Sequence, residues 1–413
     1  MVTESKKRSR TDQETTTEKP VKKQVLEGGS VLDSILLPNK AHAADSEDFR
    51  IVTGTYERIL YGINAYWKKA ESTTTTTTPK LRLEPIFIVP AHTGCIRTVA
   101  IGGQFLASGS TDEVIRLYDV KKRKEYGSLG GQHRGDVTDI QFYGKYMLSA
   151  SDDKTICIWR KSDWEYLKTL KGHKGRVNSV AIHPSGKIAL SVSSDKTVIV
   201  WNLMTARKAS MNKLYQEGLC VLWNKTGDKY AIMFDRQIKI YNVADAEVTS
   251  TISHRSRFLC MRYYTSNSDN KEYIISGHED KTIRIWDAST GELATELAGH
   301  KLRVKTITII EPTLPNSSGE EKDKAVTVLV SVSSDGVIKC WDVEAGLAKK
   351  EEQEVLLGEY DTKSRATCCT AHVGFSKAVV QQQQEQRSSK GDKKKKREEE
   401  EEEEEEKASE DSE

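Results

Sequence analysis

The stretch from Gly172 to Asn202, GHKGRVNSVAIHPSGKIALSVSSDKTVIVWN, is the unit from which the rest of the chain can be interpreted. Three short runs at 177–182, 188–193 and 197–201 are rich in branched apolar residues and predict β-strands. The segments between them, Pro184-Ser185-Gly186 and Ser194-Asp195-Lys196, are typical of tight turns. The stretch therefore predicts three strands joined by tight turns, framed by Gly-His and Trp-Asn.

The second half of this unit recurs along the chain. Seven cassettes align without gaps, at 51–64, 106–119, 147–160, 189–202, 229–242, 274–287 and 329–342. The cassettes from the second to the sixth end 40–45 residues apart, which is the period of a propeller blade. The wider spacings at either end are explained by a threonine run at 73–78 and a polar insertion at 312–324, both expected to be loops.

The repeated Gly-His…Trp-Asp pattern resembles the WD40 family over roughly residues 91–342. The resemblance implies an all-β fold, a seven-bladed β-propeller of four-stranded blades, extending over 49–375. It also implies that the first cassette lacks its inner strand, which the apolar run at 366–373 would supply. Such a closed ring removes the exposed sheet edges that endanger β proteins.

The resemblance further implies an internal hydrogen-bond relay in each matching blade, which joins His, Ser, Asp and Trp. The matching sets are His92, Ser108, Asp112 and Tyr118; His133, Ser149, Asp153 and Trp159; His173, Ser191, Asp195 and Trp201; His254, Ser276, Asp280 and Trp286; and His300, Ser331, Asp335 and Trp341. Such sets also resemble hydrolase triads, but repetition at a structural period favours scaffolding over a catalytic site. Their spacing likewise disfavours a metal centre. The cassettes at 51–64 and 229–242 lack the set and should form the least rigid blades.

Composition indicates a basic body with charged tails. The net charge of +2 divides into −1 for residues 1–48, +8 for 49–375 and −5 for 376–413. The seven cysteines follow no metal-binding or disulfide spacing, which suits a reducing compartment. No apolar run is long enough for a membrane span, and no phosphate loop or isolated nucleophile points to an enzyme or to a cofactor.

Both tails are expected to be disordered. In the first, residues 1–48, two basic clusters have the spacing of a bipartite nuclear import signal, formed by Lys7, Arg8, Lys19, Lys22 and Lys23. The alternative is that these clusters are only solvated charges. The second, residues 376–413, runs from glutamines through lysines into nine consecutive glutamates at 398–406, which we expect to compete for a basic surface of the body.

Basic residues recur after the predicted relay histidines and turn aspartates, at positions that WD40 proteins place on the top face. The predicted basic rim comprises Arg97, Arg134, Lys154, Lys174, Arg176, Lys196, Arg255, Arg257, Lys281, Lys301 and Arg303. Such a rim would attract RNA phosphates or an acidic protein segment. Ordinary solubilising loop residues are the alternative explanation. No RNA-recognition motif or aromatic stacking platform is present, so sequence-specific RNA binding is not predicted.

Longer segments narrow the resemblance to the p21-activated-kinase-interacting and Mak-type WD proteins. They include 118–125 (YDVKKRKE), 163–173 (DWEYLKTLKGH), 182–187 (IHPSGK) and 201–205 (WNLMT), with 49–54 and 365–369 at the ends. This resemblance implies a non-enzymatic, monomeric scaffold in the nucleus and nucleolus, which binds assembly factors, pre-60S particles and pre-rRNA. An adaptor that inhibits p21-activated kinase is the alternative. A ubiquitin-ligase receptor is disfavoured because Trp286-Asp287 and Trp341-Asp342 are not followed by the expected arginine.

Overall fold

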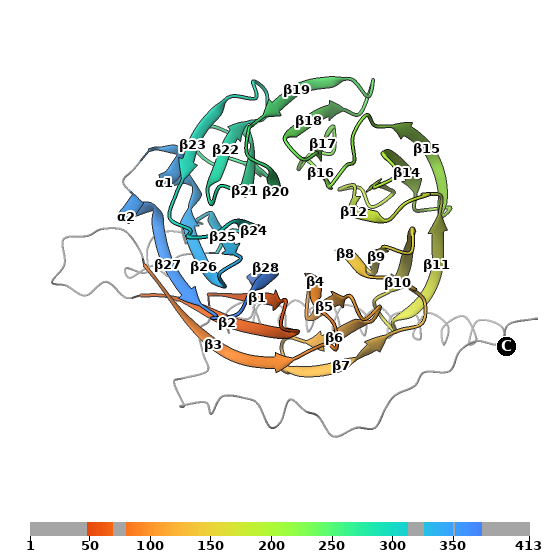
Figure 1. Ribbon diagram of the computed structural model, residues 1–413, viewed down its shortest axis with the longest axis horizontal. Helices are drawn as coiled ribbons and strands as arrows, with labels where there is room; N and C mark the ends of the chain where they lie inside the picture. Colours follow the sequence, from red (N-terminus) through yellow and green to blue (C-terminus); the bar gives the residue numbers. More distant parts are fainter. Residues whose placement is uncertain (1–47, 69–79, 313–325, 350–351, 374–413) are drawn as a thin grey trace, which may run out of the picture.

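Seven antiparallel sheets of four strands surround a common axis in the computed structural model, which describes residues 48–68, 80–312, 326–349 and 352–373 (Figure 1). The predicted tails up to residue 47 and from 376 onward lie outside these ranges, as do the import-signal residues Lys7, Arg8, Lys19, Lys22 and Lys23. The predicted loop at 73–78 also lies outside them, as does the predicted loop at 312–324 apart from Pro312. Within the described ranges the fold is the seven-bladed propeller that the repeat predicts.

The first three blades, each given from its innermost strand outward, contain the following strands. They are β28 (Ala366–Val373), β1 (Phe49–Thr55), β2 (Ile59–Trp67) and β3 (Leu81–Pro90); β4 (Ile96–Gly102), β5 (Phe105–Ser110), β6 (Ile115–Asp119) and β7 (Lys124–Leu129); and β8 (Val137–Tyr143), β9 (Tyr146–Ser151), β10 (Thr155–Arg160) and β11 (Glu165–Lys171).

The next two blades lie side by side and differ most from each other. The first, β12 (Val177–Ile182), β13 (Ile188–Ser193), β14 (Thr197–Asn202) and β15 (Arg207–Lys213), is called the intact blade below. The second, β16 (Cys220–Trp223), β17 (Lys229–Met233), β18 (Gln237–Asn242) and β19 (Val248–Ser253), is called the divergent blade.

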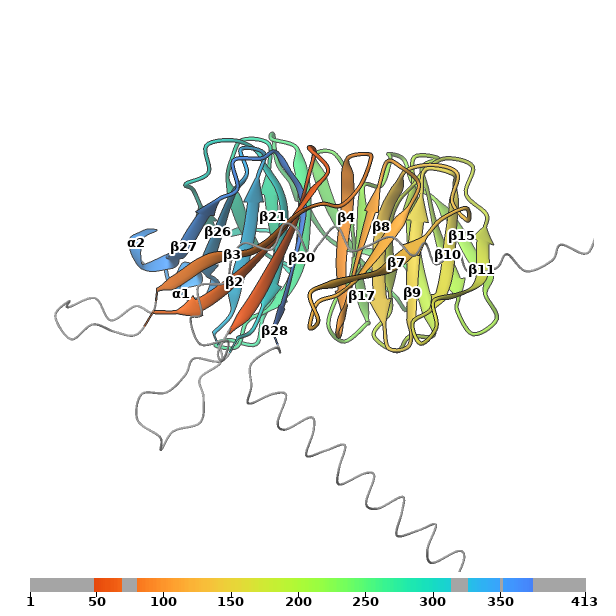
Figure 2. The same ribbon diagram turned by 90° about the horizontal axis from the view of Figure 1, so that it is seen from below.

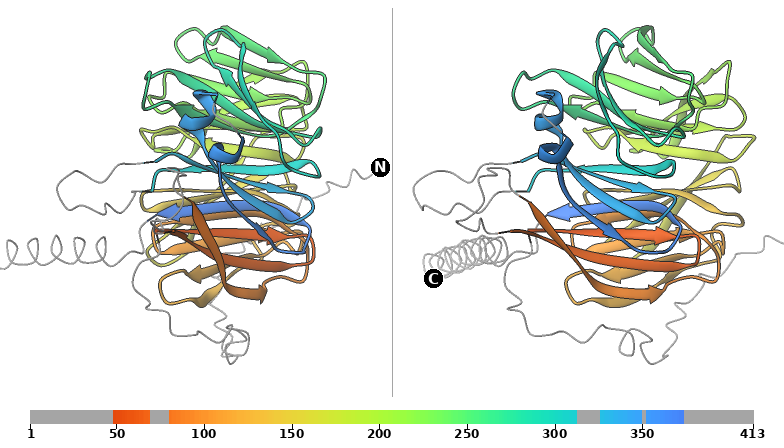
Figure 3. Two further views of the ribbon diagram at one scale, coloured as in Figure 1. Left: turned by 90° about the vertical axis from the view of Figure 1, so that its left-hand side faces the viewer. Right: turned by 60° about the vertical axis from the view of Figure 1, so that its left-hand side comes forward.

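The last two blades complete the ring. They contain β20 (Phe258–Thr265), β21 (Glu272–His278), β22 (Ile283–Asp287) and β23 (Leu293–Leu297), then β24 (Val304–Ile310), β25 (Val328–Ser333), β26 (Val337–Asp342) and β27 (Leu356–Asp361). Two short helices, α1 (Val343–Leu347) and α2 (Glu352–Val355), connect β26 to β27 at the outer edge of the ring (Figures 1 and 3). None of the helices in the described segments is long and apolar enough to cross a membrane.

The two ends of the described chain meet in one sheet. Strand β28 pairs antiparallel with β1, so that Cys369 lies opposite Thr53 and Ala371 opposite Ile51. The Thr367 hydroxyl donates to the Ile96 carbonyl of the next blade at 2.6 Å. The strand at 366–373 thus supplies the inner strand that the first cassette lacks.

Apolar side chains fill the spaces between neighbouring blades. Trp201 and Trp341 are among the largest fully buried side chains. Trp201 packs in one cluster with Ile156 of β10 and Ile199 of β14, so its indole joins two blades. Burial of such a large side chain contributes on the order of 3 kcal/mol, which makes these interfaces the main apolar core. Figure 2 shows the blades side-on, with their strands running between two opposite faces.

Candidate functional site

The relay in the intact blade is a continuous chain of hydrogen bonds. The Trp201 indole N–H donates to Ser191 Oγ at 2.7 Å, and Ser191 Oγ lies 2.7 Å from His173 Nε2. Because the serine oxygen accepts from the indole, its own proton is free to go to Nε2, which leaves Nδ1–H to donate to Asp195 at 3.1 Å. The relay therefore joins the inner core of the blade to a turn at its end.

Burial and hydrogen bonding set the protonation of this relay. Burial lowers the pKa of His173, which keeps the imidazole neutral as the relay requires. Burial alone would raise the pKa of Asp195, but donors from Thr197, the Lys174 main chain and His173 outweigh it and lower the pKa to about 2. A neutral histidine and an ionised aspartate thus satisfy each other in a partly buried position.

Two other blades repeat this geometry. In β8–β11, His133 lies 3.0 Å from Asp153 and 2.8 Å from Ser149, and Trp159 donates to Ser149 at 2.9 Å. In β4–β7, His92 contacts Asp112 at 2.9 Å and Ser108 at 2.7 Å. Tyr118 occupies the tryptophan position, but its hydroxyl is buried without a hydrogen-bond partner among the described residues, so the predicted hydrogen bond between Tyr118 and Ser108 is not formed.

The blade β20–β23 corrects the sequence prediction for His254. Ser276 Oγ contacts His278 Nε2 at 2.9 Å and accepts from the Trp286 indole at 2.8 Å, whereas His254 Nδ1 accepts from the Ser256 main chain. Two residues apart on one strand, Ser276 and His278 point to the same side, so His278 reaches the serine first. Asp280 instead accepts a hydrogen bond from the Thr282 hydroxyl and forms an ion pair with Arg284. A signal was available, because the other relays have serine at this position, namely Ser110, Ser151, Ser193 and Ser333.

The blade β24–β27 carries a shortened relay. His300 Nε2 lies 2.7 Å from Ser331 Oγ, which accepts from Trp341 at 2.8 Å. Asp335 Oδ1 accepts from the Val337 main chain, while Asp335 Oδ2 and His300 Nδ1 are buried without a hydrogen-bond partner among the described residues. The predicted contact between His300 and Asp335 is therefore not formed.

The relay serines are inaccessible to a substrate. Ser149, Ser191, Ser276 and Ser331 each have 0% exposure. Each also accepts an indole proton in addition to its contact with histidine, so its hydroxyl has a structural role within the sheet. In the described ranges, no three His, Cys, Asp or Glu side chains gather closely enough to hold a metal ion. The features that face a partner must be sought at the surface.

The relay aspartates position the basic rim at one end of the propeller, here called the top face. Asp195 accepts the Lys174 main-chain N–H at 2.7 Å, and Asp153 accepts that of Arg134 at 3.0 Å. Lys154, Lys196 and Lys281 follow the turn aspartates with φ of 72°, 58° and 76°, in the left-handed region. All the predicted rim residues are exposed except Arg303, which is half-buried; they are Arg97, Arg134, Lys154, Lys174, Arg176, Lys196, Arg255, Arg257, Lys281, Lys301 and Arg303.

Two rim arginines are already neutralised by the divergent blade. Arg176 pairs with Glu217 at 3.0 Å, and Arg257 pairs with Asp235 at 2.5 Å. Glu217 precedes β16, and Asp235 lies in the turn between β17 and β18. The rim is therefore uneven, since its charge is partly cancelled on both sides of this blade.

The opposite side of the top face carries four cations, here called the basic arc: Arg97, Arg303, Lys305 and Arg365. Arg97 and Lys305 occupy β-bulges near the starts of β4 and β24, and Arg365 directly precedes β28, which lies between those strands. A bulge re-aims its extra side chain. Burial, followed by the neighbouring charges of Arg303, Arg365 and Arg97, lowers the pKa of Lys305.

No residue of the basic arc forms an ion pair with another described residue. Arg303 donates to Ser334 at 3.2 Å, and the Arg365 guanidinium lies over the Tyr56 ring at 5.3 Å. The nearest carboxylate contact is that of Glu57, which accepts the Arg365 main-chain N–H at 3.0 Å. Sequence reasoning missed Lys305, although it lies five residues after His300, as Arg97 does after His92. It missed Arg365 because that residue follows neither a relay histidine nor a turn aspartate of the relay.

This architecture, with its repeated relay, defines a WD40 β-propeller. The family model described as "WD domain, G-beta repeat" matches residues 83–119, 124–160, 164–202 and 246–287. The unmatched interval between the last two contains strands β16, β17 and β18 of the divergent blade. The relay's departure in that blade thus coincides with a departure from the family pattern.

Three relatives narrow the family. A p21-activated protein kinase-interacting protein 1-like protein of Danio rerio is 34% identical over 323 residues, covering 78% of this chain and 80% of the relative. Protein MAK11 of Saccharomyces cerevisiae is 34% identical over 367 residues, covering 79% and 83%. The human p21-activated protein kinase-interacting protein 1 is 34% identical over 319 residues, covering 77% and 76%. The chain belongs to this family of WD40 proteins.

Proposed function

We propose that this WD40 scaffold is non-catalytic and acts in nucleolar assembly of the large ribosomal subunit. The observation that carries the proposal is the basic arc, whose four cations form no ion pair within the described part of the chain, in a propeller related to MAK11. Charges held in this way attract anionic partners and guide their approach. The partners of the proposed scaffold are assembly factors of pre-60S particles and the backbone of pre-rRNA.

The test reverses three charges of the basic arc, in the variant Arg97→Glu, Arg303→Glu, Arg365→Glu. Arg134→Glu, Lys174→Glu, Lys281→Glu is the matched control, since it changes the net charge equally on the same face. Tagged chains are followed in density gradients together with precursors of the large subunit. We expect the first variant to lose association about tenfold and the control about twofold. Equal behaviour of the two variants, both folded by circular dichroism, would contradict a role for the arc.

A second candidate function is regulation of a p21-activated kinase. Relatives from Danio rerio and Homo sapiens are named as interacting with this kinase, which supports the alternative. The tagged chain separates the two candidates. Recovery of large-subunit precursors favours assembly, and recovery of a kinase without them favours regulation. Nucleolar location is tested in parallel by Lys19→Ala, Lys22→Ala, Lys23→Ala, which should leave the chain in the cytoplasm if the import signal operates.

A further inference from the structure

The divergent blade opens a groove where the neighbouring intact blade carries its relay. In the relays of His92, His133 and His173, the histidine precedes the aromatic residue by 26–28 residues, so the corresponding positions before Tyr241 are 213–215. None of these is histidine, and Ala231 and Tyr241 replace serine and tryptophan. Tyr215 points outward with 96% exposure. Smaller or displaced side chains leave the space between the intact and divergent blades incompletely filled.

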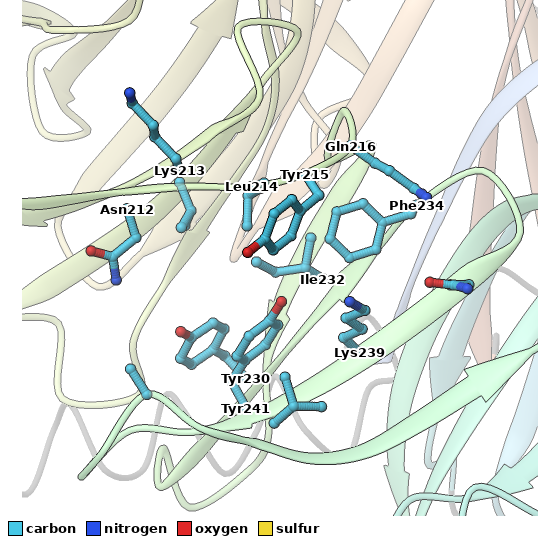
Figure 4. A pocket seen from close by; sticks show the side chains of 14 residues that line it. Asn212, Lys213, Leu214, Tyr215, Gln216, Tyr230, Ile232, Phe234, Lys239 and Tyr241 are labelled. Atoms are coloured by element: carbon cyan, nitrogen blue, oxygen red, sulfur yellow. The ribbon is translucent and has the colours of Figure 1, made fainter.

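The resulting groove has a volume of about 260 Å³. Figure 4 shows the Tyr215 and Phe234 rings on one side of Ile232 and the Tyr230 and Tyr241 rings on the other. The last two rings are stacked, with centroids 5.0 Å apart and planes 7° apart. Small-molecule pockets usually measure about 300–1,000 Å³, so this groove suits one or two side chains of a peptide.

The charged side chains that line the groove are both cations, and its other polar side chains are neutral amides and phenols. Lys213 and Lys239 line it, and no carboxylate does. Lys239 Nζ lies 5.9 Å from the centre of the Phe234 ring, so its charge is held at the groove. Neither the Tyr230 nor the Tyr241 hydroxyl has a hydrogen bond to another described residue. Burial raises the pKa of Tyr230 to about 12 and also raises that of Tyr241, so both phenols remain neutral donors at physiological pH.

We infer that this groove binds a short acidic segment of a partner protein, with an aromatic or branched apolar side chain inserted between Tyr215 and the stacked rings of Tyr230 and Tyr241. The rings would receive the apolar anchor, and flanking Asp or Glu carboxylates would accept from the two lysines and two phenols. The site is separate from the basic arc and independent of the proposed function. Loss of binding at either site would leave the other intact.

Three synthetic fluorescein-labelled nonapeptides serve as probes, with binding to the full chain followed by fluorescence anisotropy. They contain one central Phe flanked by four Glu on each side, the same flanks with a central Ala, and a central Phe flanked by Lys. We expect the first peptide to bind about tenfold more tightly than the second, and the third not to bind. Equal affinity of the first two peptides would overturn the proposed anchor.

Matched variants locate the binding. Lys213→Glu should weaken the first peptide at least about fivefold, whereas Lys171→Glu, at the equivalent end of β11, should change affinity less than about twofold. Tyr215→Ala should weaken it similarly, with Met204→Ala as the control because Met204 is 76% exposed. Tyr241→Trp should fill the groove and weaken binding while the blade stays folded. Equal effects of Lys213→Glu and Lys171→Glu, or unchanged binding by the Tyr241→Trp chain, would overturn the proposal.

A truncated chain and a competing oligonucleotide test whether something other than an acidic partner segment occupies the groove. A chain lacking residues 374–413, which contain the nine glutamates at 398–406, should bind the peptide unchanged, and a marked gain in affinity would instead assign the groove to the chain's own carboxy-terminal segment. A nine-nucleotide oligouridine should not displace the peptide. Displacement that depends on Tyr215 would mean that the tyrosines stack on nucleobases, which would overturn the choice of an acidic peptide.

Discussion

The intact and divergent blades have the same backbone plan and differ in what fills it. Both contain four antiparallel strands, and both have a register shift where the third strand meets the fourth. In the intact blade, Trp201, Ser191, His173 and Asp195 form one hydrogen-bonded chain. In the divergent blade, Tyr241 stacks on Tyr230, and Asp235 turns outward to Arg257. The strand pattern is thus sufficient to form the blade. The relay adds rigidity to the intact blade, and its loss in the divergent blade leaves an open surface.

The largest difference should follow truncation of the large aromatic residue. Trp201 has 1% exposure, so Trp201→Ala should lower the free energy of unfolding by about 3–5 kcal/mol. Tyr241→Ala, at a half-buried ring, should cost only about 1–2 kcal/mol. Chemical denaturation combined with hydrogen exchange on the two blades measures both losses. Equal losses would mean that the divergent blade is packed as tightly as its neighbour.

The second difference concerns the turn aspartates. Asp195→Ala would leave donors of His173, Lys174 and Thr197 without their acceptor, at a cost of about 2–3 kcal/mol. Asp235 is about half exposed and mainly pairs with Arg257, so Asp235→Ala should cost at most about 1 kcal/mol. Thermal unfolding of the two variants side by side tests this. A larger loss at Asp235 would contradict the assigned role of the relay.

The smallest difference is a pH effect in blades β20–β23 and β24–β27, whose buried histidines have strongly lowered pKa values. Burial, with Arg284 as the next cause, lowers the pKa of His278 to about 3; burial, with Lys339, lowers that of His300 to about 4. The unfolded value is about 6.5, so the unfolded state binds protons first as pH falls. The stabilisation is complete above about pH 6.5 and is lost toward pH 4 and 3, by up to about 2 kcal/mol per histidine at pH 5.

Hydrogen exchange at pH 7 and pH 5, corrected for intrinsic rates, checks this pH effect. Protection should fall in blades β20–β23 and β24–β27 and change least in the divergent blade, whose strands contain no histidine. His300→Gln should remove most of the change in β24–β27. Persistence of the full effect in that variant would assign it to another group.

Much of the fold could be predicted because it depends on a period. Repeated spacing fixed the seven blades, and the unpaired apolar run at 366–373 predicted where the ring would close. The relay was harder, since spacing chose His254 while strand geometry brings His278 to Ser276. Ser276 and His278 are two residues apart on β21, so their side chains lie on the same face of the sheet. The family pattern looks for the histidine in the loop before the innermost strand and therefore does not consider His278.

The surface was predicted only in outline. The basic residues of the rim could be read from the sequence, but their pairing could not. Glu217 and Asp235 lie 41 and 22 residues from the arginines that they neutralise. Lys305 and Arg365 gather with Arg97 because β24, β28 and β4 are neighbours only in the closed ring. The groove could not be predicted for a similar reason. The sequence shows that the divergent blade lacks relay residues, but it does not show the shape of the surface that results.

The pairing of β28 with β1 also affects how the chain can fold during its synthesis. Cys368 pairs with Gly54 although more than 300 residues separate them in the chain. During synthesis at about 5–20 residues per second, the first blade must wait roughly 15–60 s for its inner strand. Throughout that interval β1 presents an unpaired edge that can recruit other strands. A nascent chain of this design therefore leaves that edge exposed to other chains until β28 has left the ribosome.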